Sequence, residues 1–155
     1  SMPAANSRTR RTPNPTGGWT PQAGVRIEIG GGSLQIGGPL TAIGTADDPI
    51  VFTSSAENPI AGSWGCLYFT GAPRLEHVVV EYAGSGEGCS GADFTAAVYL
   101  PSAANLIDTT FRHIAGNPIR SNSCPASLTA WCANGFEDYT AAQPIDCSNV
   151  QTACN

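Results

Sequence analysis

The sequence predicts an all-β solenoid closed by a disulfide-rich C-terminal cap, and three observations lead to this prediction. Short apolar groups, rich in β-branched and aromatic residues, are separated by corners that draw on 18 glycines and 12 prolines. A pair of these groups recurs further along the chain, as in proteins built from stacked coils. The six cysteines form no Cys-x-x-Cys pair and fit disulfides better than zinc or redox chemistry.

The first residues of the chain predict an irregular arm. Residues 1–24 are rich in Pro, Thr, Asn and Arg and show no hydrophobic periodicity. Regular structure is expected from Val25, because Val25, Ile27 and Ile29 alternate with charged residues. This alternation predicts a strand with one buried face, and Gly30 ends it.

An internal repeat predicts how the coils stack. The segments 66–69 and 75–82 recur as 97–100 and 106–113, both shifted along the chain by the same interval. Alternate positions are apolar in both copies, so these side chains are expected to form the core. The inward residues expected to stack are the pairs Leu67 and Val98, Phe69 and Leu100, Leu75 and Leu106, Val78 and Thr109, and Val80 and Phe111.

The next coil is shorter. Pro118-Ile119-Arg120 follows the second copy after about 21 residues, a length typical of solenoid repeats. The longer first copy then contains an insertion, residues 84–94, which carries Cys89 and is expected to emerge as a loop.

Several of these segments resemble a known family. The stretches 40–45, 49–54, 64–65 and 75–84 (LTAIGT, PIVFTS, WG and LEHVVVEYAG) resemble coils of secreted bacterial right-handed parallel β-helix proteins with the pectate-lyase-like fold. The resemblance covers residues 24–122 and implies a short right-handed parallel β-helix. It does not carry catalysis over, because the pectin-degrading members depend on Gly-His-Gly and Arg-x-Lys, and this chain has no lysine and no Gly-His-Gly.

The tail, residues 123–155, lacks the coil pattern and is expected to cap the exposed strand edges at the end of the solenoid. Sequence alone leaves several disulfide pairings open. We expect Cys66 to pair with Cys89 of the insertion, and the four tail cysteines to pair among themselves. The disulfide candidates are Cys66, Cys89, Cys124, Cys132, Cys147 and Cys154.

One outward column of side chains is the candidate binding site. In the repeat alignment Tyr68, Tyr99 and Arg120 fall on the same outward position of successive coils. Tyrosine offers an apolar ring with a polar tip, so an exposed column of this kind can bind a sugar or a partner surface. The alternative is that the column has no binding role and is an ordinary surface feature over which the arm or the insertion lies.

The same alignment brings together three residues that can be interpreted either as a catalytic group or as structural ion pairs. Glu81, Asp108 and His77 can form an acid/base group, since paired carboxylates with a nearby histidine can move protons. Each acid also has a basic neighbour, with Glu81 beside Arg112, which favours cross-strand ion pairs instead. His113 aligns at an inward position and is expected to be a core histidine. No catalytic residue, metal ligand or cofactor is therefore assigned.

Composition excludes two classes of partner and indicates a compartment. The net charge is −5, and three of the seven arginines are Arg8, Arg10 and Arg11 of the arm, so no basic surface remains for nucleic acid. No apolar run approaches the roughly 20 residues of a membrane span. Three disulfides suit an oxidising compartment, so the protein is expected to be secreted or held at the cell surface.

These observations favour a non-catalytic extracellular module that binds a polysaccharide or a surface partner. Two alternatives stay open: a carbohydrate-active enzyme, lyase or hydrolase, or a fragment of one, and a structural subunit that self-associates through its coil ends.

Overall fold

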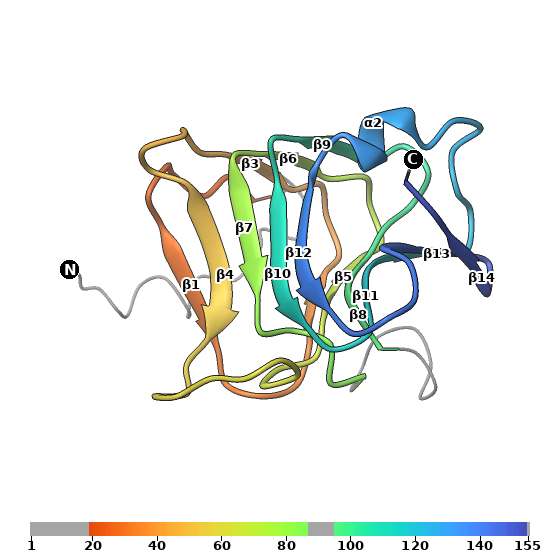
Figure 1. The fold of residues 1–155 in the computed structure, drawn as a ribbon. Coiled ribbons are helices and arrows are strands. Elements are labelled where there is room, and N and C mark those ends of the chain that lie inside the picture. Colours follow the sequence, from red (N-terminus) through yellow and green to blue (C-terminus); the bar gives the residue numbers. More distant parts are fainter. Residues whose placement is uncertain (1–18, 87–94, 155) are drawn as a thin grey trace.

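Three sheets run along the molecule, each built from strands of successive turns of the chain (Figure 1). The computed structural model describes residues 19–86 and 95–154. Within them the chain forms an all-β parallel solenoid of about four turns. The predicted fold class is therefore confirmed.

The strands of each sheet follow one another in chain order along the solenoid. Sheet 1 contains β1 (Arg26–Ile29), β4 (Ile50–Ser54), β7 (Val78–Glu81), β10 (Thr110–Ile114) and β12 (Gly135–Tyr139). Sheet 2 contains β2 (Leu34–Ile36), β5 (Leu67–Phe69), β8 (Ala96–Tyr99), β11 (Asn117–Ser121), β13 (Ile145–Cys147) and β14 (Val150–Thr152). Sheet 3 contains β3 (Thr41–Ile43), β6 (Arg74–Glu76) and β9 (Asn105–Ile107).

The register of the strands confirms the internal repeat. Parallel pairing places Leu67 beside Val98, and Val80 beside Phe111, and each pair is separated by the interval between the two copies of the repeat. The shorter next coil is also confirmed, because Ile119 pairs with Val98. The alternation read from the sequence therefore gives the correct inward residues for the five stacked pairs.

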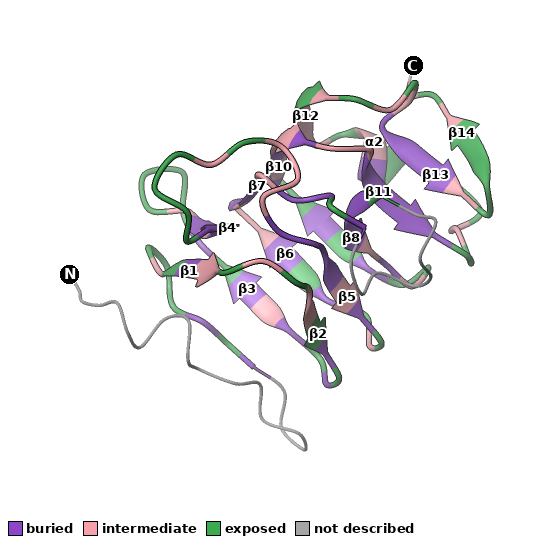
Figure 2. Ribbon diagram, turned by 90° about the horizontal axis from the view of Figure 1, so that it is seen from below, coloured by how far each residue is buried: buried purple, intermediate pink, exposed green. Residues whose placement is uncertain are grey.

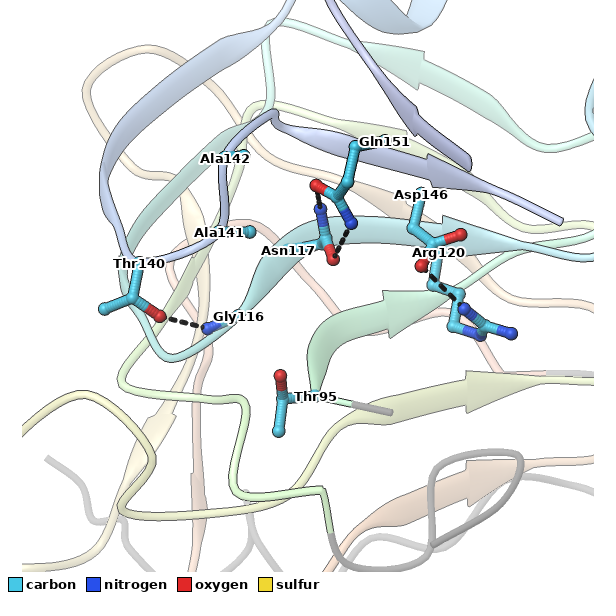
Figure 3. Close-up of a pocket in the computed structure, with 9 residues that line it drawn as sticks. All are labelled: Thr95, Gly116, Asn117, Arg120, Thr140, Ala141, Ala142, Asp146 and Gln151. Carbon is cyan, nitrogen blue, oxygen red and sulfur yellow. Dashed lines mark hydrogen bonds and ion pairs between the residues drawn. The ribbon is translucent and has the colours of Figure 1, made fainter. Parts of the chain in front are cut away.

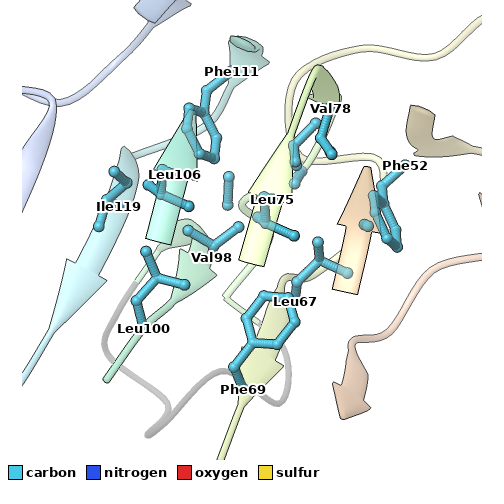
Figure 4. Close-up of a cluster of buried hydrophobic side chains, with 14 of the residues drawn as sticks. Phe52, Leu67, Phe69, Leu75, Val78, Val98, Leu100, Leu106, Phe111 and Ile119 are labelled. Carbon is cyan, nitrogen blue, oxygen red and sulfur yellow. The ribbon is translucent and has the colours of Figure 1, made fainter. Parts of the chain in front are cut away.

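The core fills the space that the three sheets enclose (Figure 4). Its side chains come from all three sheets, and the fully buried ones include Phe52, Leu67, Leu75, Val98 and Phe111. Figure 2 shows buried residues concentrated in the strands and exposed residues in many of the corners. In the first strand Ile27 is buried, while Val25 and Ile29 are partly buried against the core, as their alternation predicts.

The N-terminal boundary lies earlier than residue 24. Trp19 forms a parallel bridge with Leu40, which directly precedes β3, and is only 6% exposed. Its ring meets Phe52 edge-on at a centroid distance of 6.3 Å. Trp19 thus closes the N-terminal end of sheet 3, and a lone tryptophan shows no periodicity from which this could be predicted. The rest of the expected arm, residues 1–18, lies outside the described residues.

The C-terminal boundary also differs from the prediction. β12 pairs in parallel with β10, and β13 pairs in parallel with β11, so the middle of the tail continues sheets 1 and 2. The capping elements lie on both sides of these strands in the chain: the four-residue helix α2 (Thr129–Cys132) precedes β12 and contacts β9 of sheet 3, and β14 follows β13 and turns back antiparallel on it. No helix in the described ranges is long and apolar enough to cross a membrane.

Two disulfides hold this C-terminal region together. Cys124 is bonded to Cys147, and Cys132 is bonded to Cys154, so the four tail cysteines pair among themselves as predicted. Cys66 is also disulfide-bonded and fully buried. Its expected partner, Cys89, lies outside the described residues.

Candidate functional site

The outer surface of sheet 2 carries a straight column of side chains. Parallel register places Gln35 beside Tyr68, Tyr68 beside Tyr99, and Tyr99 beside Arg120. Arg120 is in turn the partner of Asp146 in β13. We refer to these five residues as the outer column. It contains the three residues that the sequence aligned, with one further residue at each end.

The two tyrosine rings of the outer column stack on each other. Their centroids lie 4.9 Å apart and their planes differ by 3°, and both side chains are partly exposed. Stacking covers one face of each ring, so ring edges and hydroxyl groups form a large part of what the two tyrosines can offer a ligand. A ring edge carries partial positive charge and attracts oxygen atoms. The expected contact is therefore with ligand oxygens rather than with a sugar ring stacked on an open tyrosine face.

Arg120 is buried and anchors the column. It is only 2% exposed, and its Nη1 donates to Asp146 Oδ2 at 2.8 Å. Its Nη2 donates to Asn149 Oδ1 at 3.0 Å and to Asn122 Oδ1 at 3.3 Å. Asp146 also accepts a bond from the backbone nitrogen of Asn149 at 2.8 Å. Arg120 therefore joins the coils to the C-terminal cap, and does not reach out as an exposed guanidinium.

A pocket of about 440 Å³ extends the outer column along β11 (Figure 3). Among the described residues it is lined by Thr95, Gly116, Asn117, Arg120, Thr140, Ala141, Ala142, Asp146 and Gln151. Arg120 and Asp146 belong to both the pocket and the column. The volume falls within the range of roughly 300–1,000 Å³ that is usual for small-ligand sites.

Two amide side chains form one wall of the pocket. Asn117 Nδ2 donates to Gln151 Oε1 at 2.8 Å, and Gln151 Nε2 donates back to Asn117 Oδ1 at 3.1 Å. Gln151 Oε1 also accepts from the backbone nitrogen of Gln143 at 3.2 Å. The second Nε2 hydrogen of Gln151 is left for a ligand, since a primary amide carries two.

Two hydroxyl groups complete the binding capacity of the pocket. Thr140 Oγ1 accepts a bond from the backbone nitrogen of Gly116 at 2.7 Å and keeps its own proton for donation. The hydroxyl of Thr95 has no hydrogen-bond partner within residues 19–86 and 95–154, and Figure 3 shows it without a dashed line. The pocket therefore offers both donors and acceptors.

The arginines of the other two sheets are also paired with carboxylates. Arg26 pairs with Glu28 at 3.2 Å, Arg74 with Glu76 at 3.1 Å, and Arg112 with Glu81 at 2.7 Å. With the Arg120 pair, each arginine of the described ranges has a carboxylate partner. The sequence contains no lysine.

The structure brings two of the three candidate acid/base residues, His77 and Asp108, together, and places Glu81 apart from them. Glu81 is 5% exposed; Arg112 Nε donates to its Oε1 at 2.8 Å, and Thr53 Oγ1 donates to its Oε2 at 2.8 Å. Asp108 lies 3.7 Å from His77 Nε2. His77 precedes β7 and Glu81 ends it, which separates them by about 13 Å of extended chain. Each acid therefore lies beside the basic residue of the neighbouring coil, Glu81 in an ion pair with Arg112 and Asp108 next to His77, as the structural alternative expects.

The expectation that His113 is a core histidine is wrong. Its side chain is 42% exposed, and its Nδ1 lies 2.7 Å from Asp138 Oδ2. Tyr82, His113 and Asp138 occupy equivalent places in successive coils and have left-handed φ values of 65°, 56° and 57°. A left-handed residue breaks the strand alternation, so counting by two along the strand assigned the wrong face. The ring of His113 stacks on Tyr82 at 5.0 Å instead.

The pocket residues are what sequence reasoning missed. Asn117, Gln151, Thr95 and Thr140 come from four separate segments, and Gln151 reaches Asn117 only because β14 turns back on β13. No group of three or more His, Cys, Asp or Glu suited to a metal ion occurs in the part of the chain that the structure describes. Comparison with protein-family models, curated proteins and solved structures returned no match for this chain.

Proposed function

We propose that this chain is a non-catalytic extracellular module that binds a polysaccharide through the outer column of sheet 2. The observation that carries the proposal is the in-register, partly exposed stack of Tyr68 and Tyr99. The stack leads through Arg120 and Asp146 into a polar pocket of small-ligand size.

The chemistry of the column supports a polymer with many oxygen atoms. Adjacent strands repeat the tyrosine hydroxyl and the positive ring edge at a spacing of about 4.8 Å. A polysaccharide repeats its hydroxyl and ring oxygens along its length, so it can meet the same contact on successive coils. A parallel solenoid suits this role because its strands form an extended, rigid surface.

Two further observations support a binding role outside the cell. Glu81 and Asp108, the acids of the catalytic alternative, have separate partners, Arg112 and His77, and Glu81 is buried. The Cys124–Cys147 and Cys132–Cys154 disulfides are what an oxidising compartment maintains. The resemblance of the coils to secreted bacterial β-helix proteins also supports a location outside the cell.

A glycan array probed with matched variants tests the proposal. The test variant is Tyr68→Ser with Tyr99→Ser. The control is Val79→Ser with Thr110→Ser, because these two partly exposed residues are register partners on the outer face of sheet 1, one coil apart. The parent and the control should bind the same polysaccharide, and the tyrosine variant at least tenfold more weakly, which corresponds to about 1.4 kcal/mol.

Two results would reject the proposal. If no polysaccharide on the array binds the parent, the function is wrong. If the tyrosine variant binds as well as the parent, the site is wrong. Melting curves of all three proteins show whether a loss of binding reflects a loss of the fold.

A further inference from the structure

We infer that the ligand of the outer column is a neutral polysaccharide, and that the pocket beside Arg120 receives one of its uncharged sugar units. This inference rests on the proposed function and adds the chemical class of the ligand. It is carried by the pairing of the arginines and by the hydrogen-bonding groups that line the pocket.

The charges of the described residues disfavour a polyanion. They comprise ten acidic side chains and four arginines, and each of those arginines is paired with a carboxylate. An acidic polysaccharide would therefore have to displace a carboxylate partner or approach a surface of the same sign. A neutral polysaccharide carries no such penalty.

The floor of the pocket is neutral because Arg120 and Asp146 compensate each other. Their ion pair at 2.8 Å is nearly enclosed, with side chains 2% and 10% exposed. A uronate carboxylate entering here would lie beside the Asp146 carboxylate and would lose hydration without gaining an unpaired cation. The pocket thus disfavours the charged form of a sugar unit.

The walls of the pocket suit hydroxyl groups. A sugar hydroxyl both donates and accepts, so it requires both kinds of partner within reach. The pocket supplies donors from Thr140 and from the second Nε2 hydrogen of Gln151, and Thr95 can act as donor or acceptor. A carboxylate accepts only and would leave part of this capacity unused.

Titration calorimetry with matched oligosaccharides tests the inference. The probes are β-1,4-linked hexamers of glucose and of mannose, each measured beside the hexamer of the corresponding uronic acid. The polysaccharide selected on the array is added as its hexamer, with and without oxidation of its C6 hydroxyl to a carboxylate. The neutral member of at least one pair should bind at least tenfold more tightly than its acidic partner.

A pocket variant makes the test specific. Thr95→Val removes the hydroxyl that has no partner in the described ranges while keeping the shape of the side chain, and should weaken the neutral hexamer about fivefold. Thr110→Val, on the outer face of sheet 1, is the control and should bind like the parent. The inference is overturned if the uronate hexamers bind as tightly as the neutral ones, or if Thr95→Val binds like Thr110→Val.

These outcomes separate the inference from the function on which it rests. If the uronate hexamers bind as tightly as the neutral ones and this binding depends on Tyr68 and Tyr99, the proposed function holds and the inference is wrong. Absence of binding to every hexamer and to the array would remove both.

Discussion

Phe136 of the cysteine-rich tail stacks on Phe111 of the preceding coil, with ring centroids 5.7 Å apart and planes 12° from parallel. The two residues are register partners in β12 and β10. Phe111 is fully buried, and Phe136 is partly buried against the same core. The apolar column of sheet 1 therefore continues into the tail, so the tail stabilises the last coil as well as capping it.

Replacing Phe111 by Asp should prevent folding. The carboxylate would lie between stacked side chains of neighbouring coils, without a charged or hydrogen-bonding partner. The control is Thr110→Asp, because Thr110 is the adjacent, partly exposed residue of the same strand, and it should cost at most about 0.5 kcal/mol. Soluble yield and thermal melting followed by circular dichroism measure both. A cooperatively melting Phe111→Asp protein would show that the inward assignment is wrong.

Removing the Cys124–Cys147 disulfide should lower stability without abolishing the fold. The bond closes a loop with a sequence separation of 23, for which chain-entropy arguments give roughly 3 kcal/mol. The double variant Cys124→Ala, Cys147→Ala should therefore unfold at a lower urea concentration than the parent. An unchanged midpoint would mean that the strand pairing of β13 holds the tail in place without the disulfide.

The Glu81 and Arg112 pair should matter more than the exposed pair of Arg26 and Glu28. Arg112→Met leaves the Glu81 side chain, 7% exposed, with only Thr53 as a polar partner among the described residues and should cost about 2 kcal/mol. Arg26→Met should cost no more than about 0.5 kcal/mol, because that pair is exposed. Adding Glu81→Gln to Arg112→Met should recover part of the loss. Equal urea midpoints for the two arginine variants would contradict the assignment of Glu81 as buried and dependent on its partner.

Gly116 should not tolerate a side chain. Its φ is 91°, and a Cβ atom there would collide with the backbone oxygen and the side chain of Thr95. Gly116→Ala should cost about 2 kcal/mol or more, since the left-handed strain and the collision add. Gly37→Ala is the control, because Gly37 has open space around its Cβ position. If the two variants have the same melting temperature, the corner between β10 and β11 is not as tight as described.

The stacking of the coils could be predicted from the sequence, but the residues at which the solenoid begins and ends could not. A constant spacing between the two copies of the repeat, together with alternating apolar residues, was sufficient to align Val80 with Phe111 and Tyr68 with Tyr99. The tail carries a weaker form of the same signal, since Pro144-Ile145-Asp146 repeats the pattern of Pro118-Ile119-Arg120. That repeat is very short, and its interval differs from the intervals between the earlier coils. The density of cysteines in the tail is the stronger signal, and it indicates a cap.

The candidate site could be predicted only where it follows the coil period. The outer column does so, because one strand of every coil contributes one residue to it. The pocket does not, because Gln151 reaches it through an antiparallel return, which the coil period does not describe. The exposure of His113 was missed for a related physical reason: a left-handed corner shifts the side chain away from the face that strand alternation assigns.

Binding of a polysaccharide to the outer column can be tested directly by mapping the bound face by NMR, which a chain of 15.9 kDa permits. Amide chemical shifts are recorded while the neutral hexamer that binds best is added. We expect the perturbed amides to lie around Tyr68, Tyr99, Asn117 and Gln151 on sheet 2, and the amide signals of Val79 and Arg112 on sheet 1 to stay unchanged. Perturbations centred on sheet 1 or sheet 3, or no perturbation with any polysaccharide, would contradict this expectation.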